Sequence, residues 1–223
     1  MLDSHRFLAI VNASILYLPL AVLPARGEQA RVAPVTLYTD FQRYPPAPLF
    51  ASIQDELGVI MKPAGLDFDW HPLADAGGRV SSWLAVIHFK GACDAAGLRP
   101  DTGYAGPLGW TYVSDGEILP FIDVNCDGIR LFVQHDLIAV PAAEREEAFG
   151  RAVARVIAHE LYHVLANTKA HRGSGIAKAA YSVGDLLSQT FQFGKKDCTS
   201  LRLRAAHFET QMPGEVAVTA QGQ

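Results

Sequence analysis

Apolar residues alternate or cluster in short runs through the first half of the chain, a pattern that predicts β-strands. The runs lie at residues 35–39, 66–71, 82–90, 110–113 and 118–124. Asp115 and Gly116 separate the last two runs, and this pair favours a tight hairpin turn. A further apolar run at 129–135 is short and fits either a strand or a helix.

Four other segments carry apolar residues at helical spacing. The first covers residues 48–62 and is stopped by Pro63 and Gly65. The others cover residues 142–168, 183–193 and 197–211. These elements predict an α+β fold: a small, mixed, twisted sheet with a backing helix, then a long helix, then a mostly helical C-terminal part.

The segment 142–168 has the signals of one long helix. Glu144, Glu146 and Glu147 place negative charge in its first turns, where the helix dipole favours it. Asn167 suits its end, because Asn tolerates the left-handed conformation that often follows a helix. A long helix therefore carries the most informative motif of the chain.

That motif is His159-Glu160-Leu161-Tyr162-His163. Histidines four residues apart lie on one helix face, one turn apart, which lets two imidazoles reach the same tetrahedral metal ion. A buried Glu160 without a partner would cost several kcal/mol, and a nearby metal removes this difficulty. Zinc is the expected ion, because imidazole nitrogens suit it.

The pattern HExxH resembles the signature of the zincin metallopeptidases. The order strand, helix, strand, strand, hairpin, long helix over residues 33–171 is also similar to the amino-terminal lobe of that group. Within it, the metzincins continue the motif as HExxHxxGxxH and add a Met-turn. This chain departs from that pattern, because Ala166 replaces the glycine and Lys169 replaces the third histidine.

The third metal ligand is therefore displaced from the metzincin position. His171 lies two residues later, and Asn167 with the Gly-rich segment 172–175 allows the chain to turn back, so we assign the role to it. Asp185 and Glu209 are the alternatives: Asp185 also suits a helix capping box, and Glu209 a solvated helix face. Met212 fits either a Met-turn or an ordinary helix end.

The resemblance implies a secreted zinc metalloendopeptidase in which His159, His163 and His171 bind Zn²⁺ and Glu160 is the general base. Tyr181 is a candidate for assisting the oxyanion, as a downstream tyrosine does in some metzincins. An extended peptide or protein substrate would pair with an exposed strand edge, either 118–124 or 110–113. The alternative is a secreted zinc-binding module that has a zincin-like fold and no catalytic activity.

Length and charge change this picture little. The chain has 223 residues and a net charge of −4, which gives no reason to expect a nucleic-acid partner. We expect one zincin-like catalytic domain over 28–212, divided into an α/β lobe at 33–168 and a helical lobe at 169–212. A loose tail follows at 213–223, and a monomer is expected.

Residues 1–27 are typical of a secretory signal peptide. Arg6 precedes a mostly apolar stretch at 7–23, and Ala25 and Gly27 supply the small residues of a cleavage site. The mature protein is then secreted or periplasmic and has no stable membrane association. Export permits a disulfide, and Cys93 with Cys126 is the expected pair, two free buried thiols being the alternative.

Overall fold

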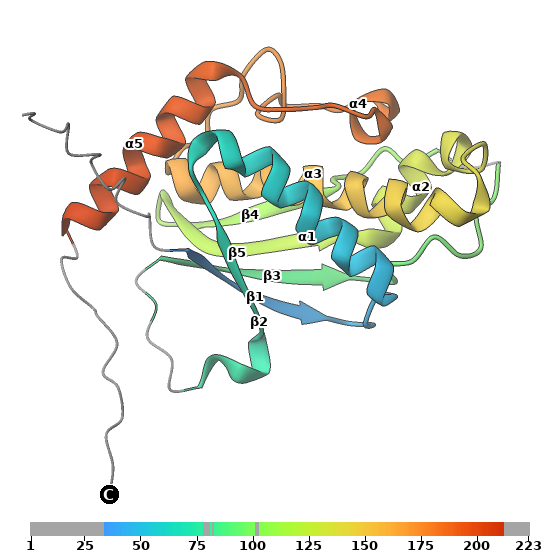
Figure 1. Ribbon diagram of the computed structural model, residues 1–223, viewed down its shortest axis with the longest axis horizontal. Helices are drawn as coiled ribbons and strands as arrows, with labels where there is room; N and C mark the ends of the chain where they lie inside the picture. The colour runs from blue at the N-terminus through green and yellow to red at the C-terminus, as the bar shows by residue number, and fades with distance from the viewer. Residues whose placement is uncertain (1–33, 78–80, 82, 101–102, 212–223) are drawn as a thin grey trace, which may run out of the picture. The chain divides into compact units, whose positions relative to one another are not determined.

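The computed structural model describes residues 34–77, 81, 83–100 and 103–211 (Figure 1). The expected signal peptide at 1–27, Met212 and the expected tail at 213–223 lie outside these residues. The elements described below belong to one unit, which follows Arg31.

A five-stranded sheet with the order β2-β1-β3-β5-β4 forms the base of the fold (Figure 1). Its strands are β1 (Val35–Phe41), β2 (Phe68–Pro72), β3 (Leu84–Lys90), β4 (Gly109–Ser114) and β5 (Glu117–Asn125). Four strands run parallel, and β4 pairs antiparallel with β5 at the edge. Asp115 and Gly116 have φ of 51° and 87°, so the predicted hairpin turn is confirmed.

The helices are α1 (Ala47–Met61), α2 (Cys126–Leu137), α3 (Arg145–Ala166), α4 (Val183–Leu187) and α5 (Lys195–Gln211). Figure 1 shows α1 and α3 over the same face of the sheet. The two helices approach closely at Gly150, where a Cβ atom would lie only 2.8 Å from the Ser52 side chain. The mixed sheet with its helices confirms the α+β class.

The long helix α3 lies at the centre of this packing. Each of its residues from Ala148 to His163 is buried, including the charged Arg155 and Glu160. The Arg155 side chain is fully buried and pairs with Glu56 of α1, with 2.8 Å between Nε and Oε1. A helix this enclosed holds its side chains in fixed positions, which suits a site that needs accurate geometry.

One segment whose secondary structure was ambiguous in the sequence is now assigned, and one predicted helix is shorter than expected. The ambiguous run 129–135 belongs to α2, which Asn125 caps by accepting a hydrogen bond from the Gly128 N–H. The helix expected at 183–193 is wrong beyond Leu187, where α4 ends. Nη1 of Arg155 donates to the carbonyl oxygens of Asp185 and Leu186, which a continuing helix would need for its own hydrogen bonds. The C-terminal part is thus less helical than predicted.

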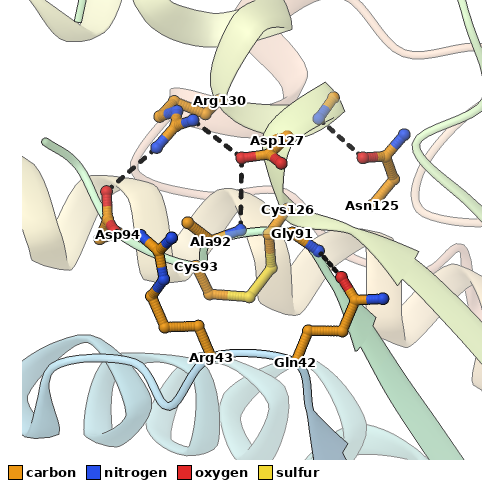
Figure 2. Close-up of a disulfide and its surroundings, with 11 residues drawn as sticks. Gln42, Arg43, Gly91, Ala92, Cys93, Asp94, Asn125, Cys126, Asp127 and Arg130 are labelled. Carbon is orange, nitrogen blue, oxygen red and sulfur yellow. Dashed lines mark hydrogen bonds and ion pairs between the residues drawn. A yellow bond between two sulfur atoms is a disulfide. The ribbon is translucent and has the colours of Figure 1, made fainter. Parts of the chain in front are cut away.

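A disulfide joins Cys93, just after β3, to Cys126 at the start of α2, as expected (Figure 2). Both cysteines are buried, whereas Cys198 is a free, half-buried thiol. Asp127 reinforces this junction by accepting hydrogen bonds from the Ala92 N–H and from Arg130. Among the described residues, none of the helices is both long and apolar enough to cross a membrane.

Replacing both Cys93 and Cys126 with Ala is expected to lower the free energy of unfolding by about 3–4 kcal/mol. The bridge closes a loop with a sequence separation of 33, and the chain-entropy estimate for such a loop is about 3.7 kcal/mol. Urea unfolding followed by circular dichroism measures the difference. Cys198→Ala is the matched control and should change stability little. Equal stability of the double variant and the wild type would contradict the expectation.

Candidate metal centre

The motif His159-Glu160-Leu161-Tyr162-His163 lies in the last two turns of α3. Asn167 ends this helix in the left-handed conformation, with φ of 48°, so the helix end is as predicted. The following loop returns over the helix, and the carbonyl groups of Thr168 and Ile176 reach the two histidines.

Both helix histidines are oriented by these carbonyl groups. Nδ1 of His159 lies 2.8 Å from the Ile176 oxygen, and Nδ1 of His163 lies 2.7 Å from the Thr168 oxygen. A carbonyl oxygen only accepts, so each Nδ1 must carry the hydrogen. Each Nε2 of a neutral ring therefore presents a lone pair. The two Nε2 atoms face one another at 3.1 Å.

Two facing lone pairs repel unless a proton or a metal ion lies between them. A proton is disfavoured here, because burial lowers the pKa of His159 to about 4 and also lowers the pKa of His163. A metal ion suits the geometry: two nitrogens bound at about 2.0–2.1 Å to a tetrahedral zinc lie about 3.3 Å apart. The residues present therefore fit a zinc ion.

His171 joins the two helix histidines. One ligand atom from each of the three residues lies within 4.8 Å of the others. The His171 ring centre is 5.2 Å from that of His159 and 4.9 Å from that of His163. His171 is exposed, and the helix pair is buried, so the cluster has one side open to solvent.

The two alternative ligands are placed differently. The Asp185 carboxylate accepts from Ser182 in a capping box and pairs with Lys178, and Asp185 is not part of the histidine cluster. These contacts lower the pKa of Asp185 despite its partial burial. Glu209 belongs to α5, but its side chain lies outside what the structure describes. Of the described candidates, only His171 accompanies the helix pair.

Glu160 points toward the edge strand β4. Its Oε2 accepts a hydrogen bond of 2.8 Å from the hydroxyl of Thr111. Burial raises the pKa of Glu160 to about 7, and the Thr111 hydrogen bond partly opposes this rise. Gly109 permits the close approach of the strand, because a Cβ atom there would lie 2.8 Å from Val156 and 3.2 Å from Cγ of Glu160.

The sequence does not single out Thr111 or Gly109 as site residues. Their two-residue spacing places them on one face of β4, which a strand pattern could have indicated. The sequence does not indicate which face of β4 packs against α3, so the contact between Thr111 and Glu160 could not be predicted from it.

Tyr181 lies beside the cluster, with its ring centre 5.6 Å from that of His159. Its hydroxyl donates to the Ile176 carbonyl at 2.5 Å, the same oxygen that orients His159. Burial raises the pKa of Tyr181, so the phenol stays protonated at neutral pH. That Tyr181 assists an oxyanion remains a prediction. Its observed hydrogen bond to the Ile176 carbonyl stabilises the loop that carries His171.

A hollow of about 610 Å³ opens over the histidines and Glu160. Its walls include residues of β4, the loop 104–108 before it, and the segment 178–181. Most of the strand residues that border the hollow belong to β4, one of the two edges expected for substrate, and Ile118 of β5 also lines it. The other expected edge, 118–124, lies mostly inside the sheet, because residues 121–125 pair with β3.

Three imidazoles and one carboxylate thus meet at the floor of a single hollow. Neither a scan against models of known protein families nor a search of curated proteins gives a match. The function is therefore inferred from the geometry and chemistry of this centre.

The metal-free protein offers a test of the Glu160 environment. The pKa of Glu160 in the folded protein, about 7, exceeds its ordinary value of 4.5. The protonated carboxyl group therefore makes its full contribution to folding stability below pH 4.5, and this contribution is lost as the pH rises through 7. Glu160→Gln is neutral throughout, and we expect it to be about 3 kcal/mol more stable than wild type above pH 7. Urea unfolding in chelator from pH 4.5 to 8 should show this gap growing with pH; a gap independent of pH would contradict the burial argument.

Proposed function

We propose that this protein is a zinc-dependent metallopeptidase with a zincin-like fold. The observation that supports it best is the buried Glu160 carboxylate next to two neutral, oriented imidazoles, on the floor of a hollow open to solvent. A purely structural zinc site fills all four positions with protein ligands and has no use for a base. Here three histidines leave a fourth position for solvent or substrate.

His159, His163 and His171 would hold the ion through ring nitrogens, the first two through Nε2. Zinc bound there would act as a Lewis acid that polarises a substrate carbonyl and lowers the pKa of a nearby water. The carbonyl groups of Thr168 and Ile176 keep both helix imidazoles in the required tautomer.

Glu160 supplies the proton transfer. Its carboxylate accepts a proton from the attacking water as the new C–O bond forms at the scissile carbonyl carbon. The same group then returns the proton to the amide nitrogen as the C–N bond breaks and the amine leaves. Burial raises the pKa of this carboxyl group to about 7 in the metal-free protein. A zinc ion bound beside it would lower that pKa and so favour the ionised form, which is the form that acts as a base.

The edge strand β4 suits an extended peptide substrate. Among the residues that the structure describes, it pairs only with β5, so the backbone groups of its other side are available for a substrate strand. Thr111 of the same strand touches Glu160, which would bring a paired peptide close to the base.

We also propose that the protein works outside the cytoplasm, in a secreted or periplasmic location. The Cys93–Cys126 disulfide supports this location, because such bonds persist in oxidising compartments. The amino-terminal sequence, which is typical of a signal peptide, agrees with it.

Digestion of a broad peptide library, read by mass spectrometry, tests the proposed activity. We expect cleavage that disappears after chelation and returns with one equivalent of Zn²⁺ per chain. Zinc binding at this stoichiometry without any cleavage would instead support the non-catalytic module. Cleavage that persists unchanged in the metal-free protein would refute the zinc mechanism.

A further inference from the structure

One loop organises all three histidines. The Thr168 and Ile176 carbonyl groups orient His163 and His159, and His171 lies between these two residues in the chain. The position of this loop therefore determines whether the three rings can meet at one point.

The third ring lacks the support that the first two have. His159 and His163 each donate from Nδ1 to a carbonyl oxygen, as metal-binding histidines normally do. Within the described part of the chain, the His171 ring has contacts with the other two histidines but no hydrogen bond that fixes it. Its placement must come from the backbone that carries it.

Arg172, the next residue, anchors that backbone. Its N–H donates to the Ala177 carbonyl at 2.8 Å, and it forms an isolated β-bridge with Lys178. Its side chain donates from Nε to Oδ1 of Asp197, in the first turn of α5, at 3.0 Å. The loop is thereby closed on itself and tied to a helix.

Asp197 is a strong anchor because it is buried. Its side chain is only 5% exposed, and a buried carboxylate is costly without a cation or hydrogen-bond donors. The Tyr162 hydroxyl lies 3.5 Å from the same Oδ1, and Tyr162 precedes His163 on α3. Asp197 therefore joins the helix carrying two histidines to the loop carrying the third.

We infer that the Arg172–Asp197 ion pair is the positioning element that delivers His171 to the metal ion. Neither residue touches the ion; both act through His171. This inference rests on the zinc site of the proposed function, and it adds the contact by which a displaced third histidine reaches that site.

A double-mutant cycle on Zn²⁺ affinity tests the inference, with competition titration against a chromophoric chelator as the readout. Arg172→Ala and Asp197→Asn should each weaken Zn²⁺ binding about 10–100-fold. In a His171→Ala background, the same changes should alter affinity by less than about twofold, because the ligand through which they act is gone. Arg172→Ala leaves the buried Asp197 carboxylate without its cation, so circular dichroism must check that this variant folds. Asp197→Asn leaves no buried charge and tests the inference independently.

Arg130→Gln is the matched control. Arg130 also forms ion pairs, with Asp94 and Asp127 beside the disulfide (Figure 2), and its loss should leave zinc affinity unchanged. Equal losses with and without His171 would show a purely structural role and overturn the inference, as would unchanged affinity in both single variants.

The test of the Arg172–Asp197 ion pair, which we call the anchor, can be distinguished from the test of the peptidase activity. If wild type binds zinc through His171 and the cycle shows coupling, but no peptide is cleaved, the peptidase proposal fails and the anchor stands. If wild type cleaves peptides and the cycle shows no coupling, only the anchor fails. If wild type binds no zinc, both fail.

Discussion

Glu160→Gln should lower kcat/KM for peptide hydrolysis about 10³-fold while leaving the affinity for Zn²⁺ nearly unchanged. General acid–base catalysis by a positioned side chain contributes about 10²–10⁴-fold, and Gln can neither accept nor return the proton. The amide still fits the space and can still accept from Thr111, so the histidine cluster should keep its geometry. Rates on a cleaved library peptide, with zinc affinity measured in parallel, test this expectation.

Glu147→Gln provides a matched control on the same helix. Glu147 is largely exposed and pairs with Arg151 one turn along, so its change should leave the rate within about twofold. A Glu160→Gln variant that hydrolyses peptides as fast as wild type would remove Glu160 from the mechanism.

His163→Ala should weaken Zn²⁺ binding more than about a hundredfold and abolish hydrolysis at micromolar zinc. Four-ligand structural zinc sites bind Zn²⁺ with a free energy of about 10–16 kcal/mol, which is about 3 kcal/mol for each ligand. Each 1.4 kcal/mol corresponds to a tenfold change in affinity, so the loss of one ligand costs about a hundredfold or more. The loss also frees the Thr168 carbonyl from its partner and loosens the start of the loop. Competition titration and metal analysis of the purified variant measure the change.

His135→Ala is the control for losing a histidine. Its side chain is exposed on α2 and pairs with the neighbouring Asp136, away from the cluster. Zinc affinity should remain at the wild-type value in this variant. A similar loss of zinc in both variants would mean that the ion is bound elsewhere.

The backbone elements were predictable because their signals are local. The hairpin follows from Asp115-Gly116, and the end of α3 from Asn167, since both depend on which residues accept positive φ. Short apolar runs, some alternating and some continuous, likewise predicted each strand of the sheet. The prediction failed at 188–193, because Arg155, some thirty residues earlier, binds the carbonyl groups that would extend α4.

The candidate site was predictable where it depends on helical spacing. His159 and His163 meet because four residues make about one turn, and His171 lies near them as the turn at Asn167 suggested. The contacts of Thr111 with Glu160 and of Arg172 with Asp197 were not predictable. They join residues 49 and 25 positions apart, and only the docking of β4 and α5 brings them together.

Anomalous X-ray diffraction at the zinc edge, from crystals grown with one equivalent of Zn²⁺, tests the account most directly. We predict a single strong peak at about 2.0–2.1 Å from Nε2 of His159, Nε2 of His163 and a ring nitrogen of His171, with the Glu160 carboxylate beside it. A peak bound by other residues, or none at these three rings, would contradict the account.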